Sequence, residues 1–166
     1  MKYLVVSDIH GRGFFINYLF RIAESENPDK IILLGDIMSM SEDSYRVLDF
    51  INEYRDKIVL IKGNCDFDTY FEDKLLPFYR EVINDKVFIF THGHLMNSDT
   101  LECDVYVYGH SHINRIEEYE GKILFNPGSI SLPRGESVNS YGLITDSELI
   151  VKDLEHNTIK KLSYTK

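Results

Sequence analysis

Three short apolar segments, separated by two longer stretches of helical periodicity, most constrain what this chain can fold into. The segments are rich in β-branched residues and have the length of buried strands. They cover residues 2–7, 30–36 and 57–64. The stretches between them repeat apolar residues at the three- and four-residue spacing of helices that cover a sheet. They cover residues 14–25 and 45–54, so the order β-α-β-α-β predicts a parallel sheet with crossover helices.

Local signals mark the limits of the two helices. Asn27-Pro28 is expected to end the first helix, because proline cannot continue it. Ser41 to Asp43 are expected to cap the second helix.

The second half of the chain reads as a series of strands. Strand-like segments are predicted over 78–85, 86–93 and 104–110, with a turn at Asn84-Asp85. A hairpin over 115–128 and an antiparallel meander over 141–164 follow, with turns near Glu120-Gly121, Asp146-Ser147 and His156-Asn157. The whole pattern favours an α/β protein in which two mixed sheets pack together with helices outside, as one domain over residues 1–166.

Charge and cysteine content exclude several function classes. The chain carries 18 basic and 27 acidic residues, a net charge of −9, which disfavours non-specific nucleic-acid binding but permits a small phosphoester substrate beside a bound metal. Cys65 and Cys103 form no C-x-x-C pair. The first residues are too polar for a signal peptide, and no apolar run approaches the roughly 20 residues of a membrane span. A cytoplasmic protein without membrane contact is expected.

Residues with metal-ligand chemistry follow five of the predicted strands. They are Asp8, His10, Asp36, Asn64, His92, His110 and His112. In parallel α/β sheets, ligands bind at the carboxyl ends of strands, so these side chains are expected to meet at one edge. Carboxylate, amide and imidazole donors suit Mn²⁺, Fe²⁺, Zn²⁺, Co²⁺ or Ni²⁺. Seven donors exceed one tetrahedral site and suit two neighbouring divalent ions.

The spacing of the paired ligands has a simple explanation in an extended chain. Residues i and i+2 of a strand point to the same side, so Asp8 with His10, and His110 with His112, are each predicted to face one point. Nearby glycines are expected to allow sharp exits from the strands.

These motifs, taken in order, resemble the calcineurin-like metallophosphoesterases. In chain order they are Asp8-x-His10, Gly35-Asp36, Gly63-Asn64, His92 and Gly109-His110-x-His112. Each motif alone is weak, but five in this order at strand ends are specific. The stretch NPGSISLPRG at 126–135 extends the resemblance. The chain looks similar to the small bacterial and archaeal phosphodiesterases of that superfamily, and to the retromer scaffold subunit of the same fold.

The resemblance implies a four-layer α/β/β/α sandwich with a binuclear metal centre. Asp8, His10 and His112 would bind the first ion. Asn64, His92 and His110 would bind the second, and Asp36 would bridge both. Asp36, Asn64 and His92 are also predicted to be catalytic. The first expectation for the metal is Mn²⁺, and a hydroxide between the ions would attack phosphorus in line with the leaving oxygen.

Other residues leave alternatives open at this point. Many relatives carry histidine after the asparagine of the third motif, where this chain has Cys65, so esters with good leaving groups are favoured. His94 is interpreted as supporting the ligands or facing phosphate, and Asp66 as a cap or a ligand support. His156 is expected to be exposed.

Two function hypotheses follow from this sequence. The intact ligand set favours a phosphodiesterase or phosphatase over a non-catalytic scaffold for protein–protein interaction. Natural substrate, native metal and homo-oligomeric state stay open.

Overall fold

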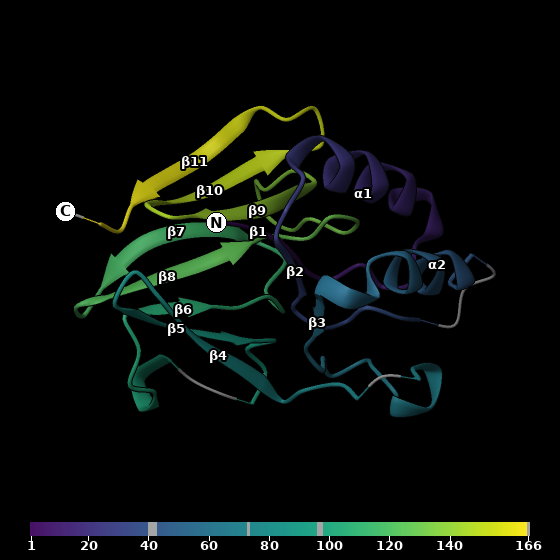
Figure 1. Ribbon diagram of the computed structural model, residues 1–166, viewed down its shortest axis with the longest axis horizontal. Helices are drawn as coiled ribbons and strands as arrows, with labels where there is room; N and C mark the ends of the chain where they lie inside the picture. Colours follow the sequence, from purple (N-terminus) through teal and green to yellow (C-terminus); the bar gives the residue numbers. More distant parts are fainter. Residues whose placement is uncertain (40–42, 73, 96–97, 166) are drawn as a thin grey trace.

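The computed structural model describes residues 1–39, 43–72, 74–95 and 98–165, and within these ranges it contains two mixed β-sheets and two α-helices (Figure 1). The first sheet has the order β11-β10-β9-β1-β2-β3. Its strands are β1 (Lys2–Val6), β2 (Lys30–Leu33), β3 (Ile58–Leu60), β9 (Ser140–Thr145), β10 (Glu148–Asp153) and β11 (Thr158–Ser163). β1, β2 and β3 are parallel to one another, and β9, β10 and β11 pair antiparallel. The predicted β-α-β-α-β order and the predicted meander are both confirmed.

The second sheet has the order β4-β5-β6-β8-β7. Its strands are β4 (Phe78–Ile83), β5 (Lys86–Thr91), β6 (Val105–Val107), β7 (Asn114–Tyr119) and β8 (Lys122–Pro127). β5, β6 and β8 are parallel, and the two outer strands pair antiparallel. Both tight hairpins turn where predicted, through left-handed residues at Asn84-Asp85 and Glu120-Gly121. Such pairs of positive φ angles match the twist of the flanking strands.

Helices α1 (Gly13–Glu26) and α2 (Tyr45–Glu53) lie side by side on one face of the first sheet (Figure 1). α1 ends at Asn27, which adopts the left-handed C-cap conformation and precedes Pro28 as predicted. α2 begins at Tyr45, as predicted, but the residue in the N-cap position is Ser44 and not one of the predicted caps. Asp43 lies in the preceding turn, and Ser41 and Glu42 lie outside the described residues.

Alternation along β1 divides the apolar core into two layers. Leu4 and Val6 pack against the helices, whereas Tyr3 and Val5 pack against the second sheet. The predicted fold class, two packed mixed sheets with helices, is therefore confirmed. Both described α-helices cover the first sheet. The outer face of the second sheet carries the 3-10 helix Ser98–Thr100, whose first carbonyl accepts a hydrogen bond from Lys122 of β8.

A polar cluster joins the two sheets at β1, β2 and β4. The Lys30 ammonium donates hydrogen bonds to the Tyr79 hydroxyl at 2.7 Å and to both carboxylate oxygens of Glu81 at 2.8 Å. The Tyr3 hydroxyl donates to the same carboxylate at 2.8 Å. These groups are mostly buried, so each needs the others as partners.

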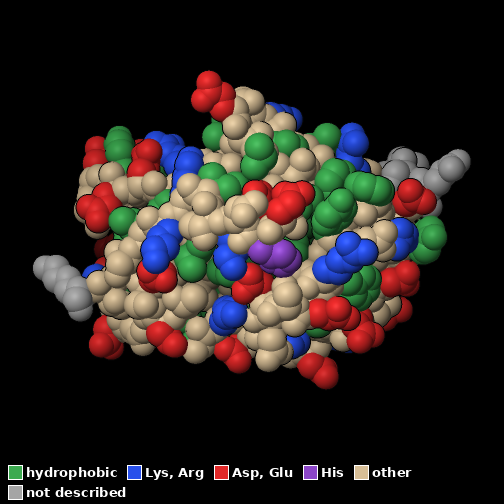
Figure 2. Space-filling view, turned by 90° about the horizontal axis from the view of Figure 1, so that it is seen from above, with side chains coloured by type: hydrophobic (Ala, Val, Ile, Leu, Met, Phe, Trp, Pro, Cys, Tyr) green, Lys and Arg blue, Asp and Glu red, His purple; other side chains and the backbone are tan. Residues whose placement is uncertain are grey.

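The surface carries charges of both signs. On the face shown in Figure 2, Lys and Arg side chains are interspersed with Asp and Glu side chains. Neither α-helix of the described ranges is long and apolar enough to span a membrane.

Candidate metal centre

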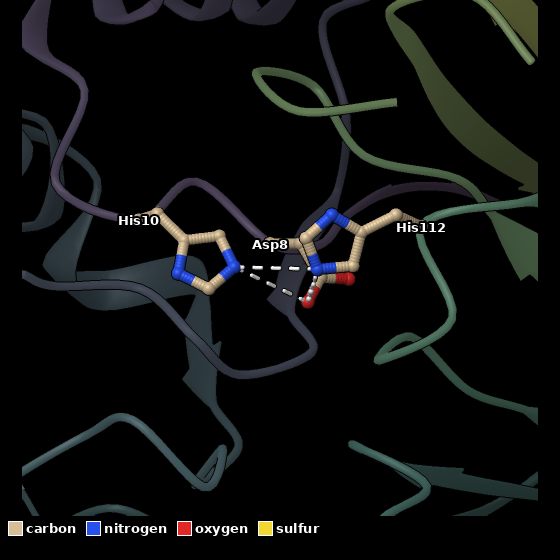
Figure 3. Close-up of side chains that lie close together, drawn as sticks. All are labelled: Asp8, His10 and His112. Atoms are coloured by element: carbon tan, nitrogen blue, oxygen red, sulfur yellow. Dashed lines mark hydrogen bonds and ion pairs between the residues drawn. The ribbon is translucent and has the colours of Figure 1, made fainter. Parts of the chain in front are cut away.

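The loops that follow β1, β2, β3, β5 and β6 meet at one edge of the two sheets, and all seven predicted ligand residues lie on these loops. Asp8, His10 and His112 form a first group (Figure 3). The Nε2 atoms of His10 and His112 are 3.3 Å apart. The Asp8 Oδ1 atom lies 3.3 Å from the His112 Nε2 atom and 3.8 Å from that of His10.

Asp36, His92 and His110 form a second group. The Oδ2 atom of Asp36 lies 3.4 Å from the His92 Nε2 atom, which is also 3.0 Å from the Oδ1 atom of Asn64. Asp36 Oδ2 lies 3.7 Å from the His10 Nε2 atom of the first group. The carboxylate of Asp36 therefore stands between the two groups, where the sequence predicted a bridge.

Hydrogen bonds fix which nitrogen of two histidines faces the centre. The Nδ1 atoms of His112 and His92 lie 2.6 Å from the Leu132 carbonyl and 2.7 Å from the Leu34 carbonyl. A carbonyl only accepts, so each Nδ1 carries a proton, and the neutral form of each ring presents its Nε2 lone pair inward.

The inward-facing atoms are therefore mutual acceptors. The lone pair of His112 faces the Asp8 Oδ1 atom, which is buried and has no hydrogen-bond partner. In the neutral form of its ring, the lone pair of His92 faces carboxylate and amide oxygens in the same way, and only a proton or a cation can lie favourably between them. Acceptors at these distances repel each other unless a cation lies between them. The donor set fits divalent metal ions.

Left-handed backbone conformations, rather than strand alternation, orient the side chains of the predicted ligand residues. Five of the seven predicted ligand residues have positive φ angles between 48° and 63°, which are uncommon for residues other than glycine. They are Asp8, His10, Asp36, His110 and His112. β1 ends at Val6 and β6 at Val107, so neither His-containing pair lies in an extended segment. The predicted clustering holds, but the explanation from alternation was wrong.

Close approach of the loops requires glycine at two positions. A Cβ atom at Gly63 would lie 2.1 Å from the Asp36 backbone nitrogen. A Cβ atom at Gly109 would lie 1.9 Å from the Ser7 hydroxyl. Any side chain at these two positions would push the ligand loops apart.

The stretch 126–135 holds the first group in place. The hydroxyls of Ser129 and Ser131 donate to the Asp8 carbonyl at 2.8 and 2.9 Å. The Asn126 amide donates to the Gly109 carbonyl at 2.9 Å. Together with the bond from His112 to Leu132, these contacts orient two of the ligand loops. In the sequence alone this stretch is only a family signature, because the side chains that meet here are distant along the chain.

Asp66 links the loops after β2 and β3. Its carboxylate accepts hydrogen bonds from the backbone nitrogens of Ile37, Met38 and Gly63 at 2.8, 3.1 and 2.9 Å. Burial raises the pKa of Asp66 in spite of these bonds. Of the alternatives left open for Asp66, the structure favours support of the ligand loops.

Cys65 lies closer to the centre than the sequence indicated. Its sulfur shares a third cluster of donor atoms with His10 and Asp36, although the sequence analysis placed no thiol among the donors. Its backbone nitrogen donates to the Asp36 Oδ1 atom at 2.8 Å. Burial, followed by the nearby charge of Asp36, raises the pKa of the Cys65 thiol to about 11.

The electrostatics of the metal-free centre follow from burial and pairing. Burial opposes ionisation of Asp36, but hydrogen bonds from His92 and the Cys65 amide outweigh it and hold the pKa of Asp36 well below its usual range. Burial likewise lowers the pKa of His92, yet contact with Asp36 outweighs it and raises that pKa. Burial lowers the pKa of His10.

The remaining histidines lie at different distances from the centre. The His94 ring centroid is 5.2 Å from that of His92 and 6.2 Å from that of His110, so His94 stands beside the second group. His156 is exposed, as predicted, and its Nδ1 atom lies 2.9 Å from the Tyr141 hydroxyl.

Two packed mixed sheets with a cluster of carboxylate, amide and imidazole donors at one edge define a metal-dependent phosphoesterase class. The chain belongs to the calcineurin-like phosphoesterase superfamily, whose domain matches residues 1–148. The predicted membership is therefore confirmed.

Among individual proteins, the chain is similar to phosphodiesterase YfcE of Escherichia coli (strain K12). The two are 32% identical, over 96% of this chain and 95% of that protein. The solved YfcE structure superposes with a TM-score of 0.91 at 26% identity, over 99% of this chain and 100% of that one. Vps29 of Entamoeba histolytica, solved in complex with Zn²⁺, gives a TM-score of 0.66 at 20% identity, over 99% and 100% of the two chains. This last likeness shows a shared fold, as expected from the resemblance to the retromer subunit.

Proposed function

We propose that this protein is a phosphodiesterase that depends on two divalent metal ions. The observation that carries the proposal is the convergence of carboxylate, amide and imidazole donor atoms on five loops, among them a buried Asp8 Oδ1 atom that accepts no hydrogen bond from the described residues. The similarity to a protein named phosphodiesterase supports the same reaction.

The ligand roles are proposed from the geometry of the two groups. Asp8, His10 and His112 hold one ion. His92, His110 and Asn64 hold the other, and Asp36 contacts both. When bound, such ions lower the pKa of water and neutralise charge on a transferring phosphoryl group. Mn²⁺ is the proposed metal, and Ni²⁺, Co²⁺, Zn²⁺ and Fe²⁺ suit the same donors.

The surroundings of the centre favour a diester over a monoester. The chain carries a net charge of −9, and Asp66 adds a buried carboxyl group beside Asp36. A diester brings one negative charge where a monoester brings about two near neutral pH, so the diester meets less repulsion. The high pKa of Cys65 makes its thiol a poor proton donor to the leaving oxygen, which favours activated esters. We propose a small phosphoester substrate and a cytoplasmic location.

The test compares the wild-type protein with Asp36→Asn, reconstituted in turn with Mn²⁺, Ni²⁺, Co²⁺ and Zn²⁺. The wild type is expected to hydrolyse bis(4-nitrophenyl) phosphate and to do so faster than 4-nitrophenyl phosphate. Asp36→Asn is expected to lose at least about a hundredfold in kcat/KM, since one carboxylate serves two ions. The control is Asp68→Asn, which removes an exposed carboxylate paired with Lys62 and is expected to keep wild-type activity.

Metal analysis of the same samples separates the competing outcomes. A saturated content of two ions per chain supports the binuclear centre, and a saturated content of one contradicts it. Full metal content without hydrolysis of either ester would instead support the alternative of a non-catalytic scaffold. The fold shared with Vps29 is the observation that supports this alternative.

A further inference from the structure

A cavity of about 430 Å³ opens beside the second ligand group, on the outer face of the second sheet. Gly93 and His94, which directly follow the ligand His92, form the wall nearest the centre. Ser98, Tyr108 and Arg115 are among the residues on the other sides. No ligand role proposed above uses these residues.

The lining of the cavity is mixed, and its aromatic and aliphatic part comes mainly from β6, the residue that follows it and β8. The rings of Tyr106 and Tyr108 are stacked, with centroids 5.2 Å apart and an interplanar angle of 26°. Leu124 of β8 and the highly exposed Leu95 complete this part of the lining. Aromatic and aliphatic side chains in such an arrangement suit a flat organic group.

Arg115 gives the cavity its charge. Of the described residues that line the cavity, it alone carries a full charge at neutral pH, since burial lowers the pKa of His94. The guanidinium is paired with Glu117 on the same strand, and both side chains are more than one-third exposed. An exposed pair contributes little stability, so the guanidinium can turn towards an anion in the cavity.

We propose that this cavity binds one ester group of the phosphodiester, and that Arg115 selects an aromatic group bearing an anionic substituent. The inference rests on the proposed function, because the phosphorus has to lie at the metal centre next to Gly93 and His94. Tyr108, held by its stacking on the buried Tyr106, contacts the ring together with the exposed Leu95, and the guanidinium contacts the carboxylate or phosphate substituent. Arg115 is thereby a specificity-determining residue for the substrate.

The test uses two symmetrical diesters that differ only in charge, diphenyl phosphate and bis(4-carboxyphenyl) phosphate. Calorimetry measures the dissociation constant of each diester for the Mn²⁺-loaded protein. Inhibition of the hydrolysis of bis(4-nitrophenyl) phosphate gives an inhibition constant for each. The wild type is expected to bind the carboxylated diester at least about fivefold more tightly, against the repulsion of its own net charge.

Arg115→Gln is expected to bring that ratio to about one while kcat for bis(4-nitrophenyl) phosphate stays within about twofold. Arg80→Gln is the matched control, because Arg80 is an exposed arginine of the same sheet that does not line this cavity. It is expected to keep the wild-type ratio. Leu95→Ala is expected to weaken both diesters equally.

The two readouts separate this inference from the proposed function. Hydrolysis with a binding ratio that Arg115→Gln leaves unchanged would overturn the inference and leave the function standing. Absence of hydrolysis together with an Arg115-dependent ratio would overturn the function and support the cavity as a binding site. Equal binding of the two diesters by the wild type would overturn the inference in either case.

Discussion

His92 is expected to make metal binding depend on pH. In the metal-free protein, contact with Asp36 raises its pKa, because a proton on Nε2 lies between the ring and two oxygens. An incoming ion has to displace that proton. The apparent affinity for the second ion should therefore fall as the pH drops below the raised pKa, by up to about tenfold per unit. Above that pKa the ring is already neutral and the dependence should level off.

Mn²⁺ titrations by calorimetry between about pH 6 and 8, in buffers of different ionisation enthalpy, measure both the affinity and the protons released. An affinity that is constant across this range would contradict the expected competition.

Cys65 is expected to be a slow nucleophile in the metal-free protein. Its pKa of about 11, against an ordinary value of 9.0, lowers the thiolate fraction near pH 8 roughly a hundredfold, and the greater basicity recovers about tenfold. Alkylation by iodoacetamide should therefore be about tenfold slower than in an unstructured peptide of the same local sequence. Mass spectrometry in a Cys103→Ser background measures this rate. Alkylation faster than in the peptide would indicate an activated thiolate and would contradict the expected low reactivity of Cys65.

The sequence identified which residues gather at the centre, but not how they are aimed. The position after a strand end was enough to bring His110 and His112 to the centre, where each joins a different group. Their left-handed φ angles could not be read from the sequence, because residues other than glycine adopt them only when tertiary contacts compensate for the cost. The position of Cys65 beside His10 could not be predicted either, because it depends on a tertiary contact. Its place depends on a bond between its own backbone nitrogen and Asp36.

At the scale of elements, strands and hairpins were predicted well because their signals are local. The Glu120-Gly121 turn and the alternation that flanks it lie within one short segment. The start of α2 at Tyr45 was predicted, but its cap residue was misassigned, since several polar residues before Tyr45 compete for the cap position. The supporting role of Ser129 and Ser131 could not be predicted, because their partner, the Asp8 carbonyl, is more than a hundred residues away.

The polar cluster between the sheets should contribute to stability through Lys30. Lys30→Met removes the cation that the mostly buried Glu81 carboxylate and the Tyr79 hydroxyl share. The free energy of unfolding in urea is expected to fall by about 1–3 kcal/mol, since a partly buried charge loses its partner.

Lys62→Met is the control for that change. Lys62 pairs with Asp68 in a more exposed setting, so its replacement should alter the free energy of unfolding by less than about 0.5 kcal/mol. Equal losses of unfolding free energy in Lys30→Met and Lys62→Met would show that the cluster between the sheets contributes no more stability than the exposed pair.

At the scale of the whole molecule, bound metal should stabilise the fold. Ions that bind the folded but not the unfolded chain add about 2.7 kcal/mol per site at a hundredfold excess over Kd. For a chain of this length that amounts to a rise in Tm of about 5–10 °C per site. Differential scanning fluorimetry with Mn²⁺, and again after a chelator, measures the rise and its reversal. A Tm that stays unchanged after both additions would contradict a pre-formed metal centre.

The left-handed ligand residues have a consequence for attempts to engineer this protein. Each such residue costs about 1–2 kcal/mol that glycine would largely avoid, and five of them cluster in a few loops. Selection of a mutant library for heat resistance in the presence of a chelator should therefore enrich glycine or asparagine at Asp8, His10, Asp36, His110 and His112. The most heat-resistant clones from such a selection would be the ones that had lost the proposed metal ligands.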